Sequence, residues 1–170
     1  TYIITLLLSP AVRVIVQFYL TRSRPDSRSG DILWKKSMKM SCALMVFEAK
    51  AAPKTRKEFM AWYEKQTEWS EDHSYNELSV CSAALQNWMN EMKQTFRPMN
   101  GPLSPSDEEF DSITEDEENL LTDYSMGREV IYGAFAWSLA EEANQLTRKL
   151  AEKHGVGFFD LQEGTIRFPD

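Results

Sequence analysis

The chain of 170 residues contains only two cysteines, Cys42 and Cys81, which excludes a secreted scaffold built on disulfides. Seven glycines and seven prolines are too few for a collagen-like or low-complexity chain. The sequence also lacks a Gly-x-Ser-x-Gly motif, a phosphate-binding glycine-rich loop and a dinucleotide fingerprint. What remains is an average composition, with 42% hydrophobic and 26% charged residues, which is typical of one globular domain.

The net charge of -7 is unevenly distributed along the chain. Residues 1–40 contain seven Lys or Arg and two acids, whereas residues 41–170 contain twelve Lys or Arg and twenty-four acids. An acidic main body argues against nucleic-acid binding, because the phosphate backbone repels it. The charge therefore predicts a basic protein partner rather than a nucleic acid.

Residues 1–39 differ from the rest, and we interpret them as an N-terminal extension and linker. An over-called translation start is one explanation, in which the domain begins near Met38 or Met40. The apolar run of residues 2–20 is long enough for a membrane anchor, but Pro10 and Arg13 at its centre argue against one. A third alternative is that residues 2–20 are an integral part of the folded domain. We expect no membrane contact unless residues 2–20 form an anchor.

Residues 40–170 have the patterns of one α+β domain. A continuous apolar run predicts a buried strand at residues 42–47, and aromatic and β-branched residues predict a second strand at 129–137. Two short strands are predicted at residues 156–161 and 165–168. The pair Glu163-Gly164 predicts a tight hairpin between the last two strands.

Helical spacing of apolar residues predicts three helices between these strands. The first begins at a capping box of Thr55 and Glu58, and the second covers Ser82 to Phe96. The third opens at a capping box of Ser138 and Glu141 and ends at Gly155. The order β-α-α-β-α-β-β predicts a mostly antiparallel sheet covered by helices.

The densest group of potential metal ligands runs from Glu68 to His73. If the first helix continued, Glu68 and Asp72 would share one face beside His73, and such a group can bind a hard divalent ion. A helix end with solvated acids explains the same residues, since a second His or Cys at metal spacing is missing. Asp160, an acid in an apolar strand, is either a perturbed catalytic carboxylate or a strand-end acid that turns toward the hairpin.

An acidic stretch at residues 107–118 contains eight acids and no base. It is either a solvated, mobile loop or a docking surface for a basic partner, because clustered charge steers association. The two cysteines are weak candidates for a catalytic nucleophile. Cys42 lies in an apolar run, where a thiol is usually inert, and Cys81 precedes a helix whose N-terminus could lower its pKa. Most tryptophans fall on element faces and are expected in the core, and an exposed one would be a good interface anchor.

Three segments, MSCALMVF at residues 40–47, VIYGAFAWSLAEEA at 130–143 and HGVGFFD at 154–160, resemble one family. Its members are small, largely uncharacterised bacterial cytoplasmic proteins, some similar to immunity proteins of polymorphic or type VI toxin systems. They have a strand ending in Trp-Ser, an Ala-Glu-Glu helix and a closing His-Gly strand with Asp. The resemblance covers residues 40–168, and Cys42 departs from the Tyr or Asp common in the family.

Two hypotheses follow. The resemblance implies a non-enzymatic cytoplasmic binding protein that neutralises a cognate toxin by occluding its active site, without metal or cofactor. Its tentative partner-binding residues are Glu68, Trp69, Glu71, Asp72, Asp107, Glu108, Glu109, Asp111, Glu115, Asp116, Glu117 and Glu118. The alternative is a small metal-assisted or acid/base enzyme, which requires Glu68, Asp72, His73 and Asp160 to converge in one pocket.

Overall fold

The computed structural model describes residues 41–170, which form one compact unit. The predictions for residues 1–39 lie outside the described residues. Among residues 41–170, no helix has the length and apolar character that a membrane span needs.

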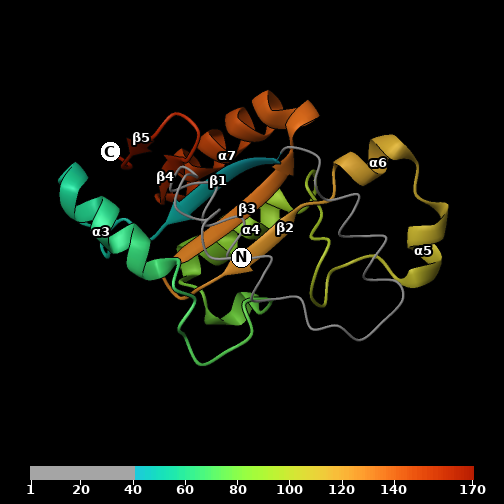
Figure 1. Ribbon diagram of the computed structural model, residues 1–170, viewed down its shortest axis with the longest axis horizontal. Coiled ribbons are helices and arrows are strands. Elements are labelled where there is room, and N and C mark those ends of the chain that lie inside the picture. The colour runs from blue at the N-terminus through green and yellow to red at the C-terminus, as the bar shows by residue number, and fades with distance from the viewer. Residues whose placement is uncertain (1–40) are drawn as a thin grey trace, which may run out of the picture. The chain divides into compact units, whose positions relative to one another are not determined.

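Five strands form one antiparallel sheet in the order β2-β3-β1-β4-β5 (Figure 1). The strands are β1 Ser41–Phe47, β2 Asp123–Met126, β3 Val130–Ala136, β4 Gly157–Asp160 and β5 Thr165–Arg167. The central strand β1 pairs with β3 on one side and β4 on the other. The buried apolar run predicted at residues 42–47 is therefore the middle of the sheet, where a strand is covered on both faces.

Helices cover the two faces of this sheet unequally (Figure 1). The helices are α3 Arg56–Gln66, α4 Ala83–Met92, α5 Asp107–Ser112, α6 Glu115–Asn119 and α7 Ala140–His154, with short 3₁₀ turns η2 Leu78–Val80 and η3 Trp137–Leu139. Helices α4 and α7 pack on one face, and α3 packs on the other. The predicted α+β class with a helix-covered antiparallel sheet is confirmed.

The main core lies between the sheet and the α4–α7 layer. Alternate residues of β1, including Leu44 and Val46, point into it and meet Trp88 of α4, which is only 1% exposed. The Trp88 indole N–H donates a hydrogen bond to the Thr147 carbonyl of α7 at 3.3 Å, which satisfies the one polar atom of that side chain. This bond and the surrounding apolar contacts join the two helices.

A second, aromatic core lies on the opposite face of the sheet. Phe47 of β1 makes edge-on contacts with Phe59 of α3 at 5.0 Å and with Phe168 after β5 at 5.3 Å. Tyr63, one helical turn after Phe59, contacts Phe159 of β4 at 5.2 Å. Phe59 and Tyr63 are therefore the buried face of α3, in agreement with the helical spacing of apolar residues that predicts this helix.

The predicted element order is incomplete, because the structure adds strand β2 and helices α5 and α6. Helix α4 ends at Met92 rather than Phe96. The predicted capping box at Ser138 is wrong: this residue lies in η3, and α7 begins after Leu139 without a side-chain cap. The C-terminal stop of α7 is confirmed, because Gly155 adopts a left-handed φ of 67°.

Candidate functional site

The acidic stretch at residues 107–118 forms two short helices, α5 and α6, rather than the loop that composition indicated. We call these two helices the acidic helix pair. Neither helix contains a buried residue. Seven of the eight acids in the acidic helix pair are exposed, and the eighth, Glu118, is partly buried. The stretch thus presents its carboxylates from a defined backbone.

Capping boxes explain why so acidic a stretch becomes helical. In α5 the Ser106 hydroxyl accepts from the Glu109 backbone N–H at 3.2 Å, and the Glu109 carboxylate accepts from the Ser106 N–H at 2.9 Å. Thr114 and Glu117 repeat this reciprocal arrangement in α6. Acids in the first turn also interact favourably with the positive end of the helix dipole.

These backbone hydrogen bonds affect titration as well as structure. The Ser106 N–H holds the pKa of Glu109 below its ordinary value, and Arg97 lowers that pKa further. The Thr114 N–H does the same for the pKa of Glu117. Both capping carboxylates therefore stay ionised at a lower pH than an ordinary glutamate does.

Arg97 connects the acidic helix pair to the loop that precedes it. Its guanidinium donates to the Leu103 carbonyl at 3.1 Å, to the Ser104 carbonyl at 3.4 Å and to the Glu109 carboxylate at 3.3 Å. One side chain thus fixes the position of α5 relative to residues 98–104.

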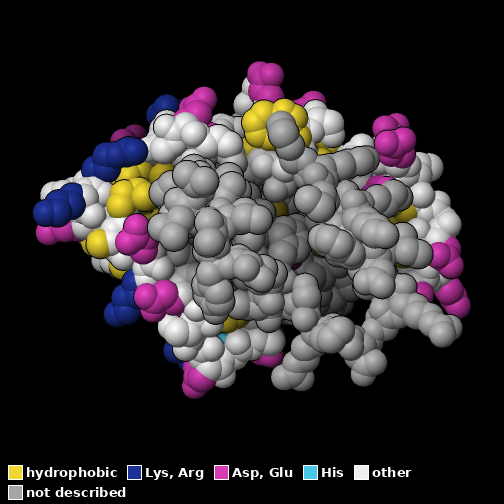
Figure 2. Space-filling model, viewed as in Figure 1, with side chains coloured by type: hydrophobic (Ala, Val, Ile, Leu, Met, Phe, Trp, Pro, Cys, Tyr) yellow, Lys and Arg dark blue, Asp and Glu magenta, His cyan; other side chains and the backbone are white. Residues whose placement is uncertain are grey.

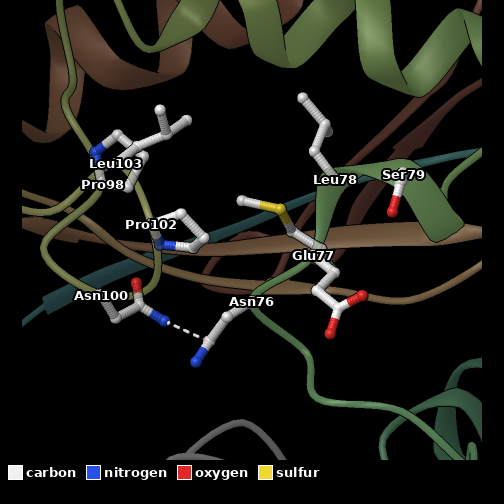
Figure 3. A pocket seen from close by; sticks show the side chains of 9 residues that line it. Asn76, Glu77, Leu78, Ser79, Pro98, Asn100, Pro102 and Leu103 are labelled. Carbon is white, nitrogen blue, oxygen red and sulfur yellow. Dashed lines mark hydrogen bonds between the residues drawn. The ribbon is translucent and has the colours of Figure 1, made fainter.

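A half-open pocket of about 230 Å³ lies between this loop and residues 76–79 (Figure 3). Its walls are mainly apolar, formed by Leu78, Pro98, Pro102, Leu103 and Met126. Asn76 and Asn100 close one side, where the Asn100 amide donates to the Asn76 amide oxygen at 2.9 Å. The pocket is smaller than the roughly 300–1,000 Å³ typical of small-molecule sites, so its size suits a single side chain.

Basic residues are missing from the two stretches that form the pocket. Residues 66–92 contain five acids and no Lys or Arg, and residues 98–127 contain nine acids and no Lys or Arg. Figure 2 shows acidic side chains at both ends of the visible face, whereas Lys and Arg gather at the end that carries α3. The pocket and the acidic helix pair therefore belong to one negatively charged part of the domain.

The residues from Glu71 to His73 form a separate network with Arg128, which lies in the turn between β2 and β3. The Arg128 guanidinium donates to Asp72 at 2.8 Å, and the Arg128 backbone N–H donates to Glu71 at 3.2 Å. His73 Nε2 lies 2.6 Å from the same Glu71 carboxylate. Hydrogen bonding to Arg128 lowers the pKa of Asp72, and a hydrogen bond to the Ser74 carbonyl, with Glu71, raises the pKa of His73.

This network fixes the loop after α3 to the hairpin. The Glu71 backbone N–H donates to the Tyr75 hydroxyl at 2.7 Å, and the Tyr75 carbonyl accepts from the Met126 N–H at 2.9 Å. Trp69, another predicted partner-binding residue, packs edge-on against Tyr75 at 5.0 Å. Trp69, Glu71 and Asp72 thus have structural contacts that sequence reasoning did not anticipate.

The residues of the enzyme hypothesis do not converge. Helix α3 ends at Gln66, so Glu68 and Asp72 do not share a helix face. Asp160 lies on β4, which is separated by β1 from the β2–β3 hairpin that carries Arg128. Its carboxylate accepts from the Asn144 amide at 2.6 Å and from the Gln162 N–H at 2.9 Å. It is the strand-end acid that turns toward the β4–β5 hairpin. Within the described part of the chain, no group of three His, Cys, Asp or Glu could hold a metal ion.

Neither cysteine has the features of a nucleophile. Burial raises the pKa of the Cys42 thiol to about 12, with Asp160 adding to the effect. Burial likewise raises the pKa of Cys81 to about 12, with a contribution from Glu71. The suggestion that the N-terminus of α4 lowers the pKa of Cys81 is wrong, because desolvation outweighs the helix dipole.

Comparison with protein-family models, with curated proteins and with solved structures finds no match. The resemblance to immunity proteins therefore depends on the sequence motifs alone.

Two parts of the site escaped sequence reasoning. The pocket combines residues more than twenty positions apart, so only the fold reveals it. The acidic helix pair did have a local signal, because Ser106 with Glu109 and Thr114 with Glu117 have the same spacing as Thr55 with Glu58.

Proposed function

We propose that this protein is a non-enzymatic binding protein of the immunity type. In this proposal it neutralises a cognate bacterial toxin in the cytoplasm by binding to the toxin and occluding its active site. The single observation that carries the proposal is the acidic surface of the helix pair and the pocket rim, where Arg97 is the one base that the described residues place against the helix pair and is already paired with Glu109. A toxin that acts on nucleic acid or nucleotides needs a basic surface, and this acidic surface is complementary to it.

The form of the acidic surface supports a role in binding. Its carboxylates lie on capped helices, so less conformational entropy is lost on association than with a disordered acidic tail. Summed like charge on one surface also accelerates encounter with a partner of opposite charge. Exposed carboxylates held in place are therefore suited to fast and specific capture of a basic protein.

The first test is co-expression of the full tagged chain with the products of neighbouring genes. We expect a stable one-to-one complex on purification and protection of cells that express the toxin. If no neighbouring product is retained and no toxin is neutralised, the proposed function is wrong.

The second test asks whether the acidic helix pair carries the interaction. A triple charge reversal, Glu108→Lys, Asp111→Lys and Asp116→Lys, changes exposed acids and leaves the capping residues intact. We expect the association rate with the captured toxin to fall about tenfold or more at low salt, because steering is lost.

A matched control reverses three exposed acids elsewhere, Glu64→Lys, Glu142→Lys and Glu152→Lys, and so changes the net charge equally. Its association rate should fall much less. Equal losses in the two triple variants would show that only net charge matters and that the helix pair is not the binding surface.

A further inference from the structure

We infer that the pocket between residues 76–79 and 98–103 receives one apolar side chain of the partner, from a segment in which Lys or Arg flanks that side chain. This inference rests on the proposed function, since it concerns how the basic partner is recognised. The inserted side chain would make binding specific for one partner, because attraction between opposite charges alone does not distinguish one basic protein from another.

The pocket's walls support an apolar occupant. Leu103, which is 39% exposed, is one of two large hydrophobic side chains that the described residues leave exposed, and the other is Trp137 at 50%. Leu103 lies on the wall opposite Leu78, so an inserted side chain would contact apolar atoms on both sides (Figure 3). Anchors buried in such pockets supply most of the energy in many interfaces.

The charge around the pocket favours a partner segment in which Lys or Arg lies beside the inserted side chain. Every residue that lines the pocket comes from residues 66–92 or 98–127, the two stretches with fourteen acids in total and no Lys or Arg. The nearest arginines along the chain already contact acids, Arg97 at Glu109 and Arg128 at Asp72. Glu77 itself lies at the pocket, so a Lys or Arg beside the inserted side chain meets carboxylates.

The two walls are joined before any partner arrives. Asn100 donates to the Asn76 side chain and to the Tyr124 carbonyl, each at 2.9 Å, and accepts from the Tyr124 N–H at 3.2 Å. Gly101 follows with a φ of 78°, and a Cβ there would lie 2.9 Å from the Cβ of Asn76. A preformed pocket of this kind loses little conformational freedom on binding.

The inference can be tested by NMR on the full, methyl-labelled chain with short synthetic peptides as probes. One peptide has a central Leu between pairs of Lys, a second has Ala in place of Leu, and a third has Glu in place of Lys. We expect the Leu–Lys peptide to shift the methyl signals of Leu78, Leu103 and Met126. The Ala and Glu peptides should bind at least about fivefold more weakly.

A pair of variants separates the pocket from general hydrophobicity. Leu103→Ala removes one pocket wall and should weaken binding of the Leu–Lys peptide about five- to tenfold. Trp137→Ala removes the other exposed hydrophobic side chain, which lies outside the pocket, and should leave the affinity unchanged. Spectra of both variants without peptide establish that each is folded.

Three results would overturn the inference. These are unshifted pocket methyls, equal affinities for the Leu and Ala peptides, or pocket shifts that grow with protein concentration in the absence of peptide. The second indicates a purely electrostatic surface, and the third indicates a second copy of this chain. None of them affects capture of a toxin by the acidic surface, which the co-expression experiment tests separately.

Discussion

The α4–α7 layer and the acidic helix pair are both helical, but they are stabilised differently. Helices α4 and α7 bury residues such as Trp88 and Leu150 against the sheet. The acidic helix pair buries none of its own residues, and it depends on two capping boxes and on Arg97. Burial stabilises the first region, and hydrogen bonds at helix ends stabilise the second.

Because the two regions are stabilised differently, residues that determine global stability lie in the α4–α7 layer, and residues proposed for recognition lie in the acidic helix pair. Isolated helices of five or six residues are too short to persist in water without further contacts, because nucleation is unfavourable. In α5 and α6, capping supplies those contacts at the surface and leaves the carboxylates accessible. We therefore expect changes in α4 and α7 to alter global stability, and changes in the acidic helix pair to alter local structure and binding.

The largest expected effect is on the first region. Trp88→Ala should lower the free energy of unfolding by about 3–5 kcal/mol, since it leaves a cavity and removes the bond to Thr147. Urea titration followed by circular dichroism measures this loss. The exposed Trp137→Ala serves as control and should change the free energy by less than about 0.5 kcal/mol. Similar losses in the two variants would contradict the description of the core.

A smaller, local effect is expected from removing the caps. Ser106→Ala and Thr114→Ala should each destabilise their own helix by about 0.5–2 kcal/mol. Amide exchange should accelerate in α5 or α6 while the exchange of α4 and α7 amides stays the same. A fall in the global urea midpoint as large as that of Trp88→Ala would mean that the acidic helix pair belongs to the main cooperative unit.

The smallest effect concerns pH. Backbone hydrogen bonds lower the pKa of Glu109 and Glu117 from the ordinary 4.5, so their stabilising contribution is present above that pH and is lost as the pH falls through the lowered values. We expect the ¹³Cα shifts of α5 and α6 to lose helical character as the pH falls below 4.5.

Helices α4 and α7 provide the internal reference for this titration. Glu91 of α4 is paired with Lys153 of α7, which lowers the pKa of Glu91. This ion pair is also lost as the pH falls, but the buried contacts of α4 and α7 remain. Helical shifts in the acidic helix pair that persist after the side-chain signals of Glu109 and Glu117 show both carboxylates to be protonated would show that capping does not hold these helices.

The sequence predicts the elements that bury a periodic apolar face. The runs at residues 42–47 and 130–136 identify the two longest strands, and Thr55 and Gly155 mark the start of α3 and the end of α7. Strand β2 was missed because it has only four residues, two of them the polar Asp123 and Ser125. It becomes a strand by pairing with β3, a tertiary effect that outweighs local propensity.

The candidate site was less predictable than the fold for a related reason. Charge predicts a docking surface at residues 107–118, but the helical form of this stretch depends on caps that charge does not reveal. The pairing of Arg128 with Asp72 joins residues far apart in sequence, and so does the pairing of Asn100 with Asn76. Contacts of this kind arise from the sheet topology and leave no pattern in a local window.

The central position of β1 has a consequence for how the domain is made. Its hydrogen-bonding partners, β3 and β4, lie near the other end of the chain, so β1 leaves the ribosome long before either can pair with it. Until residues 130–160 have been synthesised, the segment Ser41–Phe47 is an unpaired apolar strand, the kind of species that aggregates or is bound by chaperones. Folding of this domain is therefore expected to be late, dominated by non-local contacts, and sensitive to truncation of the last two strands.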